Sequence, residues 1–294
     1  MIHKQVLSRP EEIKEAIPLS GGRELPLTRP LVMGILNVTP DSFSDGGEFL
    51  ELEKAAAHAL RMEKDGADII DVGGESSRPG SEPIPEDIEL DRVLPVIDAI
   101  RAESQIPISI DTYKASVAQA AIEVGADIVN DISALRFDDK MTEVVATNKV
   151  PVVLMHMLGT PQNMQQNPTY KNCLSEIQEF FLERIEFCHE NGIDKSKLIL
   201  DPGVGFGKRL SDNLEILTHL EIYKNFSLPL LIGLSRKSFI NNLHPRHAPA
   251  EARIGGSVAG AILAIQKGAN IIRVHDVAET VEAIKVWEAL RTTK

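Results

Sequence analysis

The amino-acid sequence predicts an α/β protein that folds as a single (β/α)8 TIM barrel with a short N-terminal extension. Eight short, β-branched apolar runs alternate with longer segments of helical periodicity. The repeats fill residues 31–290 at about 32 residues each, which is the size of one strand-plus-helix unit. The runs are apolar throughout, as strands of a parallel sheet buried on both faces are. An open doubly wound sheet usually has about five or six strands, so eight favour a closed barrel.

The first 30 residues precede the repeats and combine charges, a Gly21-Gly22 pair and four prolines. We expect an N-terminal extension over 1–30, with room for a short hairpin, and a barrel over 31–294. The predicted strands are 31–38, 68–72, 107–110, 127–130, 150–155, 198–200, 229–234 and 270–274. The predicted helices are 50–65, 85–102, 115–124, 138–148, 172–191, 212–219, 250–267 and 278–291. Glycine or asparagine ends five of them, as a left-handed cap requires: Gly66, Gly125, Asn148, Gly192 and Gly268.

The charge balance and the cysteines limit the partners and the location. With 31 Lys and Arg against 43 Asp and Glu, the chain carries a net charge of −12 and lacks the basic patch of a nucleic-acid binder. Cys173 and Cys188 would lie about 22 Å apart along one helix, too far for a disulfide, so free thiols in a reducing compartment are expected. No secretory signal and no apolar stretch of about 18 residues is found. We therefore expect a soluble, cytoplasmic protein without nucleic-acid or membrane partners.

A barrel of this kind holds its chemistry at the carboxyl ends of its strands and in the loops that follow them. Polar side chains stand at or just after the end of every predicted strand. In chain order they are Asn37, Asp71, Asp111, Asn130 with Asp131, His156 after Met155, Asp201, Ser235 with Arg236 and Lys237, and Arg273 with His275. A barrel without a site has little reason to place polar residues there, so the sequence predicts an active site at this end.

Five segments at these strand ends resemble the signatures of the dihydropteroate synthase family. They are MGILNVTPDSFSDGG at 33–47, DVGGESSRPG at 71–80, DPGVGFGK at 201–208, GLSRKSF at 233–239 and RVH at 273–275. The resemblance implies a transferase of folate biosynthesis. It would condense 6-hydroxymethyl-7,8-dihydropterin diphosphate with 4-aminobenzoate to give 7,8-dihydropteroate and pyrophosphate. It also implies a homodimer, small-molecule substrates and a protein that sulfonamides target.

The pterin substrate explains the carboxylates. A pterin presents a guanidine-like edge of N–H donors, which a carboxylate accepts in pairs as it does an arginine. Asp111 and Asp201 are the candidates, and the family pattern adds Asn130 and Lys237 to the pterin pocket and Met155 to the substrate contacts. The two carboxylates would also stabilise positive charge that develops at the methylene carbon. The alternative is that an aspartate at a strand end only caps the next helix.

The diphosphate leaving group calls for cations. Arg273 and His275 follow the eighth strand, where barrels often hold phosphate, and arginine suits a forked phosphate contact. By resemblance both bind the diphosphate, and Asn37 is the predicted ligand of a Mg²⁺ cofactor shared with it. Mg²⁺ commonly takes few protein ligands and completes its shell with phosphate oxygens and water. His275 could instead be structural.

The second substrate, 4-aminobenzoate, is expected in the loops. Ser235 and the backbone that follows it would hold its carboxylate, while Phe206 and Pro79 would contact its ring. Arg78, Asp41 and Phe43 would lie in Gly-, Ser- and Pro-rich loops that close over the site and exclude water. Ser77 departs from the threonine usual in the family; the hydroxyl remains, but a methyl group that packs the loop is lost.

Two other functions remain open on sequence alone. A pterin-dependent methyltransferase domain would share the Asp/Asn pocket but not the long loop over 37–47 or the Arg273/His275 pair. A non-catalytic pterin-binding paralogue would bind pterin without turnover. An active enzyme is favoured because all the residues predicted to be catalytic stand together at strand ends: Lys237, Asp111, Asp201, Arg273 and His275.

Overall fold

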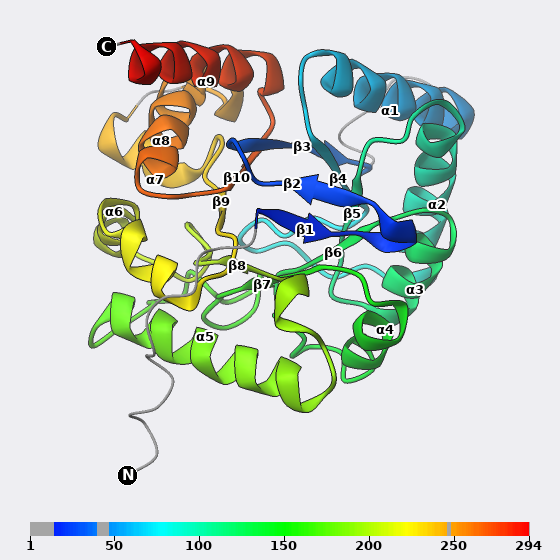
Figure 1. The fold of residues 1–294 in the computed structure, drawn as a ribbon, viewed down its shortest axis with the longest axis horizontal. Coiled ribbons are helices and arrows are strands. Elements are labelled where there is room, and N and C mark those ends of the chain that lie inside the picture. The colour runs from blue at the N-terminus through cyan, green and yellow to red at the C-terminus, as the bar shows by residue number, and fades with distance from the viewer. Residues whose placement is uncertain (1–14, 40–46, 246–247, 294) are drawn as a thin grey trace.

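The computed structural model describes residues 15–39, 47–245 and 248–293, and confirms the predicted barrel. The eight strands run parallel in the order β8-β7-β6-β5-β4-β3-β10-β9, and helices surround them (Figure 1). A single parallel bridge, between Leu200 and Leu230, joins the two ends of the sheet. The strands are β3 (Leu31–Asn37), β4 (Ile69–Gly73), β5 (Ile108–Asp111), β6 (Ile128–Asp131), β7 (Val152–Met155), β8 (Leu198–Asp201), β9 (Leu231–Gly233) and β10 (Ile271–Val274).

The α-helices follow the predicted segments closely. They are α1 (Gly47–Lys64), α2 (Glu86–Glu103), α3 (Ala115–Glu123), α4 (Met141–Asn148), α5 (Cys173–Glu190), α6 (Leu210–Thr218), α7 (Ser238–Leu243), α8 (Ile254–Gln266) and α9 (Val277–Thr292). The sequence did not predict α7, a helix of six residues that is too short to show a period. The two cysteines lie in α5 as buried free thiols. Among the described helices, none has both the length and the apolarity needed to cross a bilayer.

The predicted left-handed caps are right at four helices and wrong at one. The glycine positions 66, 125, 192 and 268 all have positive φ angles. At α4, however, Asn148 stays in the helix and Lys149 takes the left-handed conformation, with a φ of 51°. The Asn148 side-chain amide donates to the carbonyl of Val144, 2.9 Å away, and to the side chain of Gln119 on the neighbouring α3, so this residue is held in the last turn.

The N-terminal extension closes the amino end of the barrel. Strands β1 (Ala16–Pro18) and β2 (Glu24–Pro26) form an antiparallel hairpin. Its side chains Ile17, Leu19 and Leu25 are buried against the first inward-facing residues of the barrel strands. Burying an aliphatic side chain stabilises the fold by about 1.5–3 kcal/mol. The hairpin therefore forms an apolar floor at the amino end of the barrel. The polar strand-end residues lie at the opposite, carboxyl end.

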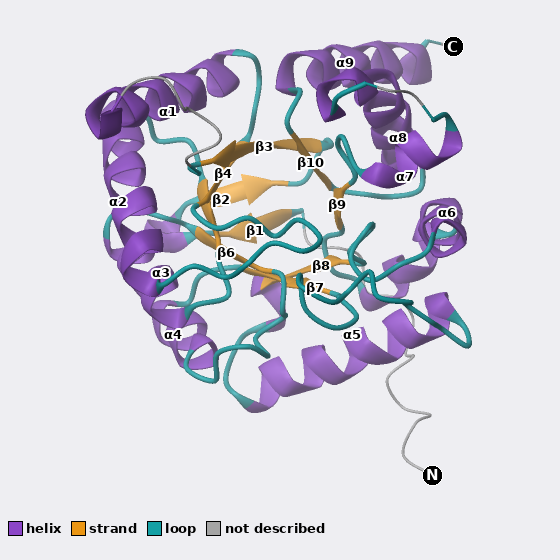
Figure 2. Cartoon of the chain, turned by 180° about the vertical axis from the view of Figure 1, so that it is seen from behind, coloured by secondary structure: helices purple, strands orange, loops and turns teal. Residues whose placement is uncertain are grey.

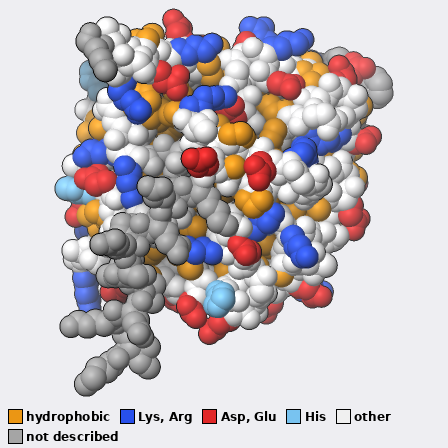
Figure 3. All heavy atoms as spheres, viewed as in Figure 1, with side chains coloured by type: hydrophobic (Ala, Val, Ile, Leu, Met, Phe, Trp, Pro, Cys, Tyr) orange, Lys and Arg blue, Asp and Glu red, His pale blue; other side chains and the backbone are white. Residues whose placement is uncertain are grey.

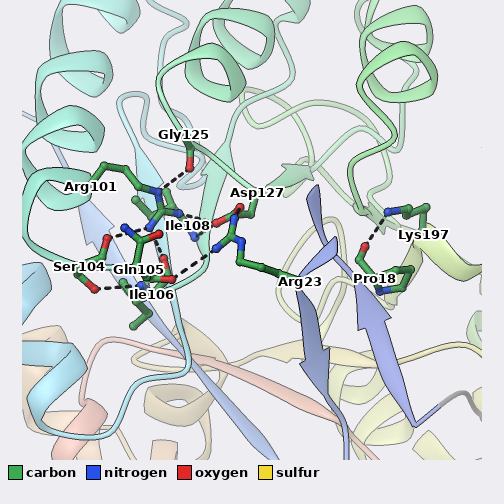
Figure 4. A network of polar contacts seen from close by, with 10 residues as sticks. All are labelled: Pro18, Arg23, Arg101, Ser104, Gln105, Ile106, Ile108, Gly125, Asp127 and Lys197. Atoms are coloured by element: carbon green, nitrogen blue, oxygen red, sulfur yellow. Dashed lines mark hydrogen bonds and ion pairs between the residues drawn. The ribbon is translucent and has the colours of Figure 1, made fainter. Parts of the chain in front are cut away.

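Polar contacts fix this floor to the barrel wall (Figure 4). The carboxylate of Asp127, at the start of β6, bridges the guanidinium groups of Arg23 and Arg101. Lys197, just before β8, donates to the carbonyl oxygen of Pro18 at 2.7 Å. On the hairpin side of the molecule, acidic and basic side chains are interspersed (Figure 3). This surface has no large basic field of the kind that binds nucleic acid.

Candidate active site at the carboxyl ends of the strands

The upper interior of the barrel is polar, in contrast to its floor. Along each strand, side chains alternate between the outer core and the barrel interior. Val72, Ile110 and Val129 belong to the outer core, so their neighbours Asp71, Asp111 and Asn130 face inward. Asp201 and Arg273 do the same on β8 and β10. The loops that follow the strands lie over this end, seen from behind in Figure 2.

Arg273 is the centre of this polar layer. Its Nε donates to Asp71 Oδ2 at 2.6 Å and its Nη2 donates to Asp111 Oδ2 at 2.7 Å. Asn130 Nδ2 donates to the same Asp71 carboxylate at 3.2 Å. No described residue accepts a hydrogen bond from Nη1 of Arg273, so this nitrogen remains for an anion. The contacts place Arg273 against the carboxylates of Asp71 and Asp111, a position that the sequence did not indicate.

The charges of this layer shift one another's pKa values. Burial raises the pKa of Asp111 to about 7, against the opposing effect of Arg273; the negative charge of Asp71 adds to the rise. Burial alone would lower the pKa of Arg273, but the carboxylates of Asp71 and Asp111 outweigh it and raise the pKa above its usual value. Arg273 is therefore a permanent cation, whereas Asp111 changes charge near neutral pH.

The sequence predicts Asp71 among the polar strand ends but assigns it no role in the site. Asp71 is fully buried and bonded to both Arg273 and Asn130. The available signal was its place at a strand end, as the first residue of the motif at 71–80. Its function became visible only through its partners.

Asp201 lies across the interior, beside an apolar wall. Burial raises the pKa of its carboxyl group, and the positive charge of Lys237 opposes this rise. Met155 is paired with it in register on β7 and is buried in a small cluster with Ile132, Met157 and Met164. The wall thus offers a flat, apolar contact next to a carboxylate, as a ring with a polar edge requires.

Lys237 and Phe206 meet at the mouth of the barrel. The ammonium nitrogen of Lys237 lies 4.4 Å from the centre of the Phe206 ring and donates to the carbonyl oxygen of Val204. Burial lowers the pKa of Lys237 to about 8, while Asp201 opposes the shift. Gly205 allows the close approach: it has a φ of 86°, and a Cβ there would lie 3.0 Å from Lys237 Cδ.

Ser235 and His275 form a second pair. Ser235 Oγ accepts the backbone N–H of His275 at 3.2 Å and lies 3.1 Å from its Nδ1. Burial lowers the pKa of His275 to about 3, and Arg273, Arg236 and Arg78 add to this effect. The imidazole is therefore neutral. If the Ser235 hydroxyl donates to Nδ1, the ring proton lies on Nε2, where it is available to an anion.

Comparisons with known proteins identify the family of this chain. The family model for pterin-binding enzymes matches residues 33–275. Dihydropteroate synthase of Escherichia coli K12 is 50% identical over 273 residues, covering 93% of this chain and 96% of the relative. The chain belongs to the dihydropteroate synthase family.

Solved dihydropteroate synthases share the fold over nearly the whole chain. The Yersinia pestis enzyme with a sulfonamide drug superposes with a TM-score of 0.88 and 48% identity, covering 95% of this chain and 100% of the other. The Xanthomonas albilineans enzyme in complex with 7,8-dihydropteroate superposes with a TM-score of 0.85 and 44% identity. The match covers 95% of this chain and 100% of the other.

The remaining dihydropteroate synthase motif residues lie at the rim. Ser77 is half-buried, whereas Arg78 and Pro79 are exposed, and their loop is fixed to the β7–α5 loop by a 2.9 Å bond from Gly80 N to Pro161 O. Asn37 is half-buried at the end of β3. Asp41 and Phe43 lie outside the described residues. Within the described ranges, no three His, Cys, Asp or Glu side chains form a metal cluster.

Proposed function

We propose that this protein condenses 6-hydroxymethyl-7,8-dihydropterin diphosphate with 4-aminobenzoate, giving 7,8-dihydropteroate and pyrophosphate. The observation that carries the proposal is the polar layer of Asp111, Asn130, Asp201 and Arg273, which lies above an apolar floor and below the mouth formed by Lys237 and Phe206. The layer matches a flat heterocycle with a polar edge, and the cations around it match a diphosphate.

The pterin ring is bound by the strand-end residues. Asp201 and Asp111 accept its N–H groups as ionised carboxylates, and Asn130 both donates and accepts beside them. Met155 and its apolar neighbours contact the ring. Because the pKa of Asp111 is about 7, this carboxylate is ionised and able to accept two N–H donors only above neutral pH.

The bond that breaks is the one between the methylene carbon and the diphosphate oxygen. Its electron pair leaves with the diphosphate, and positive charge develops on the methylene and the ring. The carboxylates of Asp111 and Asp201 stabilise that charge. Nη1 of Arg273 and Nε2 of His275 donate to the leaving diphosphate, so the negative charge is stabilised on the opposite side.

The amine of 4-aminobenzoate then forms the new bond to the methylene carbon and releases one proton to solvent. Phe206 and Pro79 contact its ring, and Ser235 with the following backbone holds its carboxylate. Lys237, held over Phe206, stands between the two substrates. The loop that carries Ser77 and Arg78 excludes water from the reactive cation. A sulfonamide resembles 4-aminobenzoate in shape and would compete for this place.

A Mg²⁺ ion is part of the proposal. The side-chain oxygen of Asn37 is a hard donor at a strand end, and no described residue forms a hydrogen bond with it. One protein oxygen suits Mg²⁺, because the diphosphate and water complete its shell. When bound, the ion neutralises charge on the leaving diphosphate.

The location and assembly also belong to the proposal. Two buried free thiols favour the reducing cytoplasm. A groove of about 670 Å³ lies between α8 and α9, lined by Ile262, Trp287 and the exposed Val286 and Leu290. Exposed apolar patches mark protein contacts, so this face supports a homodimer. Sedimentation should show a dimer, and a monomer at all concentrations would refute it.

The decisive assay measures pyrophosphate release by purified protein given dihydropterin diphosphate and Mg²⁺, with and without 4-aminobenzoate. Release and dihydropteroate formation should require both substrates. Lys237→Ala should lose most turnover while its circular dichroism stays unchanged. A folded protein that binds pterin in calorimetry without product would be a non-catalytic paralogue, and binding of a corrinoid partner would indicate a methyltransferase.

A further inference from the structure

Lys208 is a buried lysine outside the substrate-binding layer, and burial lowers the pKa of its amino group to about 7. It ends the segment 203–208 between β8 and α6, and only 3% of its surface is exposed. Its Nζ lies 3.0 Å from His156 Nδ1, 3.3 Å from the His156 carbonyl oxygen and 3.0 Å from the Phe206 carbonyl oxygen. An ammonium group has three hydrogens, and these three acceptors take all of them.

The contacts determine the protonation of His156. When protonated, Lys208 can only donate, so His156 Nδ1 then accepts and its ring proton lies on Nε2. Burial lowers the pKa of His156 to about 2, and the charge of Lys208 adds to the effect, so the ring is neutral. It lies edge-on against Phe180, with ring centres 4.9 Å apart. His156, directly after β7, is thus a neutral ring whose Nδ1 accepts from the protonated form of Lys208.

The segment that Lys208 holds lies directly against the β7–α5 loop. A Cβ at Gly203 would come within 2.0 Å of the His156 carbonyl oxygen, and one at Gly207 within 2.6 Å of the Leu158 carbonyl. The two backbones are therefore in contact. Lys208 bridges them from beneath, with one acceptor in Phe206 and two in His156.

Phe206 and Val204 of this segment are the groups that hold Lys237. The Phe206 carbonyl accepts from Lys208, its ring lies under the Lys237 ammonium, and the Val204 carbonyl accepts from Lys237. A shift of the segment would therefore move both the aromatic contact and the lysine. Asp111 and Asn130, which hold the pterin in the proposed function, stand on other strands and would stay in place, whereas Asp201 borders the segment and accepts the N–H of Gly203 at 2.7 Å.

We propose that Lys208 is a positioning residue for the aminobenzoate side of the site: its buried ammonium holds segment 203–207 so that Phe206 and Lys237 stay aligned. The proposal rests on the function proposed above, in which Phe206 contacts the ring of 4-aminobenzoate. It assigns Lys208 no contact with either substrate.

The test compares Lys208→Met with Lys197→Met. Lys197 also donates a partly buried ammonium to a backbone carbonyl, but at the floor of the barrel. Lys208→Met should raise the KM for 4-aminobenzoate about tenfold, with smaller changes in kcat and in the pterin affinity measured by calorimetry. Lys208→Gln keeps two hydrogen-bond donors, so its KM for 4-aminobenzoate should lie between those of Lys208→Met and the wild type. Lys197→Met should lower thermal stability with unchanged kinetic constants.

Nitrogen NMR of the histidine rings gives a readout independent of turnover. In the wild type below about pH 7, where Lys208 is protonated, His156 should be the neutral Nε2–H form with a hydrogen-bonded Nδ1, and Lys208→Met should shift the Nδ1 resonance towards that of a free acceptor. An unchanged aminobenzoate KM in folded Lys208→Met, or equal loss of pterin affinity, would overturn the positioning role. Both of these results concern the Lys208→Met variant alone. Absence of activity in the wild-type protein would instead overturn the proposed function.

Discussion

The substitution Arg273→Met tests the electrostatic centre of the site. It removes two charge-assisted hydrogen bonds, of 2.6 and 2.7 Å, and leaves Asp71 and Asp111 facing each other, with 0% and 12% of their side chains exposed. Removing one partner of a buried ion pair costs about 3–5 kcal/mol, because the remaining charge has no compensation. We expect a loss of that size in the free energy of unfolding at about pH 8, measured by urea denaturation.

The pH dependence distinguishes charge from packing. The folded-state pKa of Asp111, about 7, lies above its usual 3.8, so the folded protein binds this proton more tightly than the unfolded chain. Its contribution to stability is complete below about pH 3.8 and is lost as the pH rises to about 7. Without Arg273, which opposes the rise, the pKa moves higher still. The destabilisation should therefore be larger at about pH 8 than at about pH 6.

A second variant provides the control. Arg273→Met with Asp111→Asn has one buried charge fewer and should recover about 2 kcal/mol or more at about pH 8. The reasoning is refuted if Arg273→Met costs the same at both pH values, or if the double variant is no more stable than the single one. Either result would mean that the cost arises from lost packing of the arginine stem.

Three further predictions follow from the structure. The pH profile of kcat/KM should be a narrow bell, rising as Asp111 ionises near pH 7 and falling as Lys237 loses its proton near pH 8; a flat profile between about pH 6 and 9 would contradict these assignments. Asn37→Ala should raise the Mg²⁺ concentration for half-maximal activity about tenfold, and an unchanged requirement would remove it as a ligand. Arg23→Ala leaves Asp127 with one partner fewer, so the free energy of unfolding measured by urea denaturation should fall by about 1–2 kcal/mol while kcat stays unchanged. A loss of turnover would instead show that the floor of the barrel affects the site.

The sequence by itself determined the order of strands and helices and the end of the barrel that holds the site. Hydrophobic period, loop chemistry and glycine caps are local properties, and a few neighbouring residues are enough to express them. The polar strand ends, including Asp111, Asn130 and Asp201, were identifiable for the same reason: each directly follows an apolar run. Where the local rule failed, at Asn148, a side chain contact with the neighbouring helix had decided the cap.

Only the tertiary structure decided which of these polar groups face one another. Asp71 and Arg273 are 202 residues apart and meet because β10 pairs with β3, which in turn pairs with β4. Lys208 and His156 likewise come from different loops, and neither shows in its own surroundings that it is buried against the other. Ion pairing and burial depend on what the closed barrel brings together and shields from water. Charge states, pKa values and the alignment of Lys237 therefore follow from the fold, and the local sequence does not contain them.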